Sequence, residues 1–143
     1  MGSPSERNSM KYFHLAQLFM YWGKYIRPSQ LANFRNYLST MLSRNRVLTV
    51  FNGTELECVI CYFLTDELDT FINRPMWSTP SDNDNGHIFF VDKMVARKWT
   101  PTLRKLIQSQ VELKFPQIDK ALWLREPFNR SVIINKRGNH VYS

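Results

Sequence analysis

A single carboxylate interrupts the most apolar stretch of the sequence. Residues 88–95 read Ile-Phe-Phe-Val-Asp-Lys-Met-Val, which is typical of a central strand buried on both faces. Burial of Asp92 in such a strand would raise the pKa of its carboxyl group toward the range in which it can orient or deprotonate an attacking amine. The structural alternative is that Asp92 turns to a polar edge, or pairs with Lys93, Arg97 or a helix end, because an unpaired buried charge is costly.

Basic residues gather just after this stretch. Arg97, Lys98, Arg104 and Lys105 surround the start of a predicted helix. Positive charge there opposes the helix dipole by about 0.3–1 kcal/mol for each exposed residue. A bound phosphate would relieve this conflict, so the cluster indicates an anion site. A solvated basic face is the competing interpretation.

The two cysteines, Cys58 and Cys61, are spaced as Cys-x-x-Cys within a predicted strand. Residues three apart on a strand point to opposite faces, which suits neither a shared metal ion nor a redox pair. We therefore expect two buried thiols and no metal site. The three histidines, His14, His87 and His140, show no legible Ser-His-Asp or Cys-His arrangement.

Composition limits the class of protein. The 143 residues suffice for one domain with a real core, and 43% hydrophobic residues exclude a disordered chain. A net charge of +7 excludes an acidic solvating protein and favours an anionic partner such as nucleic acid, phosphate, an acidic protein or a membrane surface. We predict a disordered N-terminus over residues 1–10 and a single domain over 11–143. The sequence shows no signal peptide and no apolar run that spans a bilayer, so we expect a cytoplasmic protein.

Hydrophobic periodicity and turn signals predict the order of the elements. The dipeptide Asn52-Gly53 is the strongest two-residue signal for a hairpin. Residues 69–72 are interpreted either as a third short strand or as a continuation of the return strand after a bulge, before a loop over 73–86 whose residues 81–86 are interpreted as flexible. The predicted segments are helix 11–25, helix 30–44, strands 47–51 and 55–64, strand 88–95, helix 101–115, strand 121–125 and strand 131–134.

Strand 88–95, helix 101–115 and strand 121–125 form one βαβ unit, which must be right-handed. The dipeptide Thr100-Pro101 is typical of an N-cap followed by proline at the first helical position. We therefore predict an α+β fold with the three layers of an α/β protein. Its mixed sheet joins an antiparallel hairpin to a parallel pair, and an N-terminal helix pair covers it.

This order of elements resembles the N-acetyltransferase superfold, known as GNAT, over roughly residues 11–134. The resemblance implies that a substrate carbonyl lies in a splay between the central strand and the strand after the helix, and that the donor's pyrophosphate lies at the helix N-terminus. The corresponding stretch, residues 96–102, has no glycine where the family has its Gly-rich phosphate loop. The implied donor-binding residues are Arg97, Lys98, Thr100, Thr102 and Arg104, and the implied catalytic residues are Asp92 and Glu57.

Two branches of that superfold are most similar. The toxin-activating lysine acyltransferases share the pattern of Phe90-Val91-Asp92-Lys93-Met94-Val95-Ala96, and they take a fatty acyl group from acyl carrier protein. The small acetyltransferase-like proteins of tailed bacteriophages share the basic helix without glycines, and some are virion components. The resemblance therefore implies an acyl-CoA or acyl carrier protein donor and an amine acceptor, in a bacterial or phage-infected cell or on a virion.

Two other classes of function stay open beside acyl transfer. One is a structural or interaction protein of the same fold, with a protein partner and without catalysis. The other is a nucleic-acid-binding adaptor, since basic and aromatic side chains alternate near the C-terminus and could stack single-stranded bases. The residues concerned are Trp99, Trp123, Arg125, Phe128, Arg130, Lys136 and Arg137.

Overall fold

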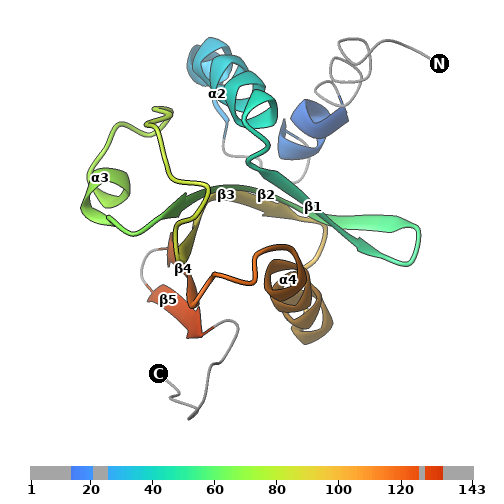
Figure 1. Ribbon diagram of the computed structural model, residues 1–143. Coiled ribbons are helices and arrows are strands. Elements are labelled where there is room, and N and C mark those ends of the chain that lie inside the picture. Colours follow the sequence, from blue (N-terminus) through green and yellow to red (C-terminus); the bar gives the residue numbers. More distant parts are fainter. Residues whose placement is uncertain (1–13, 21–25, 126–127, 134–143) are drawn as a thin grey trace, which may run out of the picture.

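A computed structural model describes residues 14–20, 26–125 and 128–133 of the chain (Figure 1). In this part the strands form one mixed sheet of five, in the order β1-β2-β3-β4-β5. The strands are β1 (Val47–Asn52), β2 (Glu55–Thr65), β3 (Ile88–Ala96), β4 (Lys120–Arg125) and β5 (Phe128–Ile133). All neighbouring strands run antiparallel except β3 and β4, which are parallel. The α+β class and the mixed sheet are therefore confirmed.

Helices cover both faces of the sheet. The helical residues 14–20, the 3-10 turn η2 (Pro28–Gln30) and helix α2 (Leu31–Ser43) lie on one face, and helix α4 (Pro101–Lys114) lies on the other (Figure 1). The predicted helix over 11–25 is confirmed for residues 14–20, and its remaining residues lie outside the described part. Helix α4 joins β3 to β4, so the predicted βαβ unit is present.

Helix α4 begins as the dipeptide Thr100-Pro101 predicted, with an N-cap followed by proline. The Thr100 side chain accepts a hydrogen bond from the backbone N–H of Leu103 at 3.0 Å, and Pro101 occupies the first helical position. Leu103 and Val111 then bury one stripe of the helix against the sheet. This packing fixes the end of β3 and the start of α4 relative to each other.

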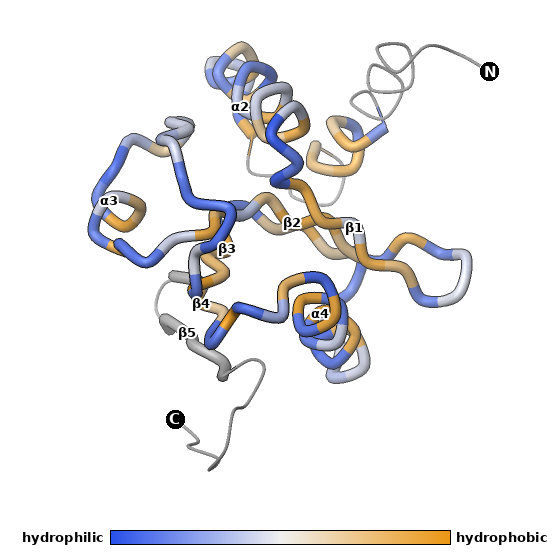
Figure 2. The backbone as a smooth tube through the Cα atoms, in the orientation of Figure 1, coloured by the Kyte–Doolittle hydropathy of each residue, from blue (hydrophilic) through white to orange (hydrophobic). Residues whose placement is uncertain are grey.

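Two apolar clusters form the core, one on each face of the sheet, and Figure 2 shows the hydrophobic colour on β1, β2 and β3 and on parts of α2 and α4. Strand β2 contributes to both clusters, and its residues from Cys58 to Leu64 are at most 1% exposed. Burial on both faces explains the near-continuous apolar run of β2. The middle strand β3 is less completely buried, with intermediate exposure at residues 92–94.

Residues 69–72 form a short helix, α3 (Asp69–Ile72), so both interpretations of this segment as strand are wrong. The chain turns out of the sheet after β2, where the Thr65 hydroxyl accepts a hydrogen bond from the Glu67 N–H at 2.8 Å. Phe71 then packs on Phe63 and Phe90 of the sheet, with ring centroids 4.8 and 6.3 Å apart. A single buried aromatic residue such as Phe71 is compatible with a helical turn as well as with a strand. The alternation of apolar and polar residues over 69–72 therefore could not distinguish the two.

The loop over 73–86 is irregular, as predicted, but its second half is tied to the sheet. Buried Arg46 donates to Asp82 at 2.7 Å and also to Asp84. Asp82 accepts a further hydrogen bond from the Leu64 N–H at 2.7 Å, and the Asn83 N–H donates to the Leu64 carbonyl at 2.9 Å. These contacts hold residues 82–84, within the segment 81–86 interpreted as flexible, against β2 and Arg46, because the buried guanidinium of Arg46 needs the carboxylates.

Gly86 lets this loop lie directly against β2. A Cβ atom at residue 86 would lie 2.7 Å from the Leu64 carbonyl carbon and closer still to the Thr65 amide nitrogen. These are backbone atoms of the most buried strand, so they cannot move aside. We expect Gly86→Ala to lower the free energy of unfolding by about 3 kcal/mol, at the upper end of typical overpacking costs.

The matched control is Gly53→Ala in the hairpin turn. Gly53 has a φ of +64° but nothing within 4 Å of an added Cβ, so only backbone strain opposes the substitution, at about 1 kcal/mol. Urea denaturation of both variants measures the difference. Equal losses of stability would show that the loop does not press on β2 at Gly86.

Candidate functional site

Strand β3 carries one extra residue at Asp92. Along the pairing of β2 with β3, Cys61 faces Lys93 and Tyr62 faces Val91, so Asp92 has no partner on β2. Such a bulge breaks the alternation of side chains. Asp92 and Lys93 consequently lie on the same face, where both contact Tyr37 of α2, whereas Val91 and Met94 pack with the cluster under α4.

The parallel pairing of β3 with β4 ends at the same place. The register runs from Ile88 opposite Lys120 to Val91 opposite Trp123. Strand β3 continues to Ala96, paired only with β2, while β4 continues to Arg125, paired with β5. Among the described strands Asp92 therefore has no ladder partner on either side, and the pairing of the two parallel strands ends just before it.

The Asp92 carboxylate is the centre of a buried polar network. It forms an ion pair with Arg74, accepts a hydrogen bond from the Tyr37 hydroxyl, and lies 3.6 Å from the ammonium nitrogen of Lys93. The side chain is 6% exposed. The structural interpretation of Asp92 is thus confirmed for Lys93 as a partner. It is wrong for Arg97, which pairs with Glu55 at 2.9 Å, because the bulge turns Asp92 toward α2.

Arg74 is the principal partner that sequence reasoning missed. It comes from the loop after α3, and its Nη1 donates to the Ser78 carbonyl at 2.8 Å and the Pro75 carbonyl at 3.2 Å. Its guanidinium carbon lies 5.0 Å from the centre of the Phe63 ring. Its Nε has no hydrogen-bond partner within the described part of the chain. No sequence signal distinguishes this arginine from the exposed ones.

A cleft opens beside this network, and we call it the Arg74 cleft. Its volume is about 190 Å³. The cleft lies between α3, the start of the following loop and β3. Its walls are Phe71, Ile72, Arg74, Met76, Phe90, Val91, Asp92 and Lys93.

Burial sets the protonation of two groups near the Arg74 cleft. Burial raises the pKa of Tyr37 well above its ordinary value, so its hydroxyl stays protonated and donates to Asp92. Burial lowers the pKa of the Lys93 ammonium, although Asp92 opposes this shift. The Lys93 nitrogen also lies 5.2 Å from the Trp77 ring centre and 5.8 Å from that of Tyr37, which favours the cation.

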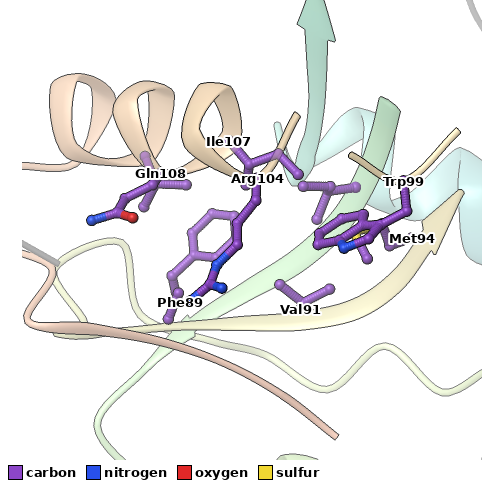
Figure 3. Close-up of a pocket in the computed structure, with 10 residues that line it drawn as sticks. Phe89, Val91, Met94, Trp99, Arg104, Ile107 and Gln108 are labelled. Atoms are coloured by element: carbon purple, nitrogen blue, oxygen red, sulfur yellow. The ribbon is translucent and has the colours of Figure 1, made fainter. Parts of the chain in front are cut away.

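A second, much smaller cavity of about 20 Å³ lies on the opposite face of β3, under α4 (Figure 3). Phe89, Val91 and Met94 form its floor, and Arg104 extends toward β3 from α4. This volume holds about one water molecule. Val91 borders both this cavity and the Arg74 cleft, so the two approach each other where β3 and β4 part.

The residues implied for donor binding are spread along the turn into α4. Arg97 pairs with exposed Glu55, and Thr100 uses its hydroxyl to cap its own helix. Lys98 and Thr102 are exposed, and Arg104 lines the small cavity. These side chains therefore have different surroundings: an ion pair for Arg97, a helix cap for Thr100, solvent for Lys98 and Thr102, and the small cavity for Arg104.

Glu57 does not join Asp92 at one site. It lies four residues before Cys61, the β2 partner of Lys93, which is about 13 Å along the strand. Cys58 and Cys61 are each 0% exposed and belong to opposite core clusters, as predicted. Within the described ranges, no group of three or more His, Cys, Asp or Glu residues is placed to hold a metal ion.

The remaining candidate residues are the histidines and the basic and aromatic residues of the C-terminal region. His14 is exposed, and His87 pairs with Asp66 at 2.9 Å. His140, Lys136 and Arg137 lie outside the described residues. The side chains of Trp123, Arg125, Phe128 and Arg130 are also outside the described part, so the nucleic-acid interpretation stays a prediction.

Comparisons with protein-family models, with curated proteins and with solved structures gave no match. Among the described residues, no helix combines the length and the apolar character needed to cross a membrane. The function must therefore be argued from the site itself.

The buried network predicts an order of stability losses. Asp92→Asn leaves Arg74 and Lys93 without a carboxylate, so we expect the free energy of unfolding to fall by about 3–5 kcal/mol. Tyr37→Phe removes one hydrogen bond to a charged group and should cost about 1–3 kcal/mol. The control Glu55→Gln breaks the exposed pair with Arg97 and should cost less than about 1 kcal/mol. Urea denaturation gives all three values, and an Asp92→Asn variant as stable as Glu55→Gln would contradict the network.

The buried thiols predict a pH dependence above neutrality. Burial raises the pKa of Cys58 to about 12 from an ordinary value of 9.0. Between these values the unfolded chain releases the proton first, so the free energy of unfolding falls as the pH rises. Cys58→Ala removes this contribution, which is at most about 1.4 kcal/mol per pH unit. Denaturation between pH 8 and 11 should therefore show a shallower decline for Cys58→Ala than for the wild type, and parallel curves would show that this thiol is not shielded.

Proposed function

We propose that the chain is a GNAT-like acyltransferase that moves an acyl group from a thioester donor to an amine. The observation that carries the proposal is the place where the parallel strands β3 and β4 part. Pairing ends at Val91 opposite Trp123, and Asp92 bulges from β3 at that point. In the superfold that the chain resembles, the acyl carbonyl occupies this position.

The acyl transfer would take place between the Arg74 cleft and the small cavity under α4, both of which Val91 borders. The amine nitrogen attacks the thioester carbonyl carbon, the N–C bond forms and the C–S bond breaks. Sulfur leaves as a thiolate and takes up the proton that the amine loses. The Arg74 cleft is large enough to admit an acceptor, and the small cavity under α4 is the side from which a donor would approach.

The role of Asp92 in this reaction is to position neighbouring side chains. Its charge is already balanced by Arg74 and its oxygens accept from Tyr37, so it holds Lys93 and Arg74 in the wall of the cleft. Arg104 is the cation on the donor side, since it lines the small cavity near the first turn of α4. Arg104 would pair with a donor phosphate.

Donor binding tests the proposal directly. A donor that binds only the folded chain raises its melting temperature, by the equivalent of about 2.7 kcal/mol at a hundred times the dissociation constant. We expect a rise with acetyl-CoA, a long-chain acyl-CoA or an acylated acyl carrier protein, and a smaller rise in Arg104→Gln. The control Arg35→Gln changes an exposed arginine on α2 and should behave as the wild type.

Release of free thiol from the donor, in the presence of a panel of amines, measures the transfer itself. An absence of any melting shift with all three donors, together with no thiol release, would reject acyl transfer. An unchanged shift in Arg104→Gln would reject the assignment of the donor site to Arg104 on α4, but it would not reject acyl transfer.

A specific observation favours the non-catalytic alternative. Thr100 already satisfies the Leu103 N–H, and Pro101 has no N–H, so the helix N-terminus offers fewer donors to a pyrophosphate. The cavity beneath it holds about one water molecule. A chain that binds a ligand in the Arg74 cleft but no thioester donor would be an interaction or binding protein of this fold.

A further inference from the structure

Lys93 contributes a primary amine to the wall of the Arg74 cleft. Its side chain is 15% exposed, against 7% for Arg74 and 6% for Asp92, so it is the most accessible of the three charged side chains that line the cleft. Phe71 and Phe90 are each only 4% exposed, and most of the accessible surface of the cleft is polar. A molecule that enters the cleft therefore meets polar groups and, among the charged ones, Lys93 first.

The buried network does not depend on the charge of Lys93. The Asp92 carboxylate already forms an ion pair with Arg74 and accepts a hydrogen bond from the Tyr37 hydroxyl. The Lys93 nitrogen lies 3.6 Å from the same carboxylate, which is longer than a good hydrogen bond. Lys93 can therefore lose its proton without leaving Asp92 unpaired.

The surroundings of Lys93 favour its neutral amine. Burial lowers the pKa of Lys93, and the positive charge of Arg74 acts in the same direction, although Asp92 opposes both. When Lys93 is neutral, Arg74 and Asp92 match each other as one cation and one carboxylate. A lysine that is desolvated beside another cation is the kind that acts as a nucleophile toward carbonyl compounds.

We propose that Lys93 is a covalent site for small polar aldehydes and ketones, which enter the Arg74 cleft and form an imine with its amine. The neutral nitrogen attacks the carbonyl carbon, and the C–N bond forms. The carbonyl C–O bond then breaks, and the oxygen leaves as water with the two protons that the nitrogen loses. This condensation needs no oxidant or reductant.

The cleft defines the class of carbonyl compound. Its mostly polar surface favours a compound with hydroxyl groups over an alkyl aldehyde. Its volume of about 190 Å³ exceeds that of a cavity of about 150 Å³ that accommodates benzene, so a compound of similar size fits. The inference goes beyond the proposed function, because the amine belongs to the chain itself and no thioester takes part.

Reductive trapping of the imine with cyanoborohydride at neutral pH tests the proposal on the wild type. Glycolaldehyde and propionaldehyde are a matched pair of probes, since a hydroxyl in the first replaces a methyl in the second. Mass spectrometry gives the labelling rate of each lysine, with exposed Lys114 as the internal reference. We expect glycolaldehyde to label Lys93 several-fold faster than Lys114, and propionaldehyde to show a smaller preference.

Two results would overturn the proposal. A lysine with only a structural role would react more slowly than Lys114, because it is mostly buried, so labelling of Lys93 no faster than that of Lys114 rejects the imine site. An equal preference with propionaldehyde rejects the polar class of compound. Neither experiment contains an acyl donor, so a failed test of acyl transfer leaves this inference unaffected, and the reverse also holds.

Entry through the Arg74 cleft is tested by narrowing it. Met76 lines the cleft and is exposed, so Met76→Trp enlarges a side chain at the entrance without altering the core. We expect this variant to slow the labelling of Lys93 by glycolaldehyde several-fold and to leave that of Lys114 unchanged. The control Met20→Trp alters an exposed methionine outside the residues that line the cleft and should behave as the wild type. Equal labelling of Lys93 in the two variants would contradict the assignment of the site to this cleft.

Discussion

The extra residue at Asp92 decides which side chains of β3 face each side of the sheet. Before it, Phe89 and Val91 face α4 while Phe90 faces α2; after it, Met94 faces α4 and Val95 faces α2. Without the bulge, strict alternation would turn Lys93 into the apolar cluster beneath α4. The bulge instead places two adjacent charges on the α2 face and ends the pairing with β4. The buried network, the Arg74 cleft and the parting of the parallel strands all begin at this residue.

Two buried ion pairs, one of them on β3, hold a long irregular segment in place. The loop from residue 73 to residue 86 joins α3 to β3, and a buried arginine–carboxylate pair fixes it near each end. Near its start, Arg74 of the loop pairs with Asp92 of the sheet. Near its end, Asp82 of the loop pairs with Arg46, just before β1. Buried pairs of this kind contribute little net stability but strongly penalise any arrangement that separates them.

The sequence predicted the elements better than it predicted the site. The parallel pair and its connecting helix were predictable, because Thr100-Pro101 marks a helix start locally and residues 88–95 form an unbroken strand pattern. The opposite placement of Cys58 and Cys61 followed from strand geometry alone. The bulge was not predictable, since an Asp-Lys pair in an apolar run is equally compatible with one residue facing a polar edge. Arg74 was also missed, because its pairing depends on how the loop folds back over eighteen residues of sequence separation.

The two buried arginine clusters differ in a way that bears on function. Around Arg46 one cation meets two carboxylates, but Asp84 is 87% exposed, so water screens the surplus negative charge. Around Asp92 two cations meet one carboxylate, and no side chain of the three is more than 15% exposed. Enclosing the second cation costs free energy, and the contacts of Lys93 with the Trp77 and Tyr37 rings offset part of that cost. The first cluster therefore has the charge balance of a loop anchor, whereas the second encloses one cation more than its single carboxylate matches.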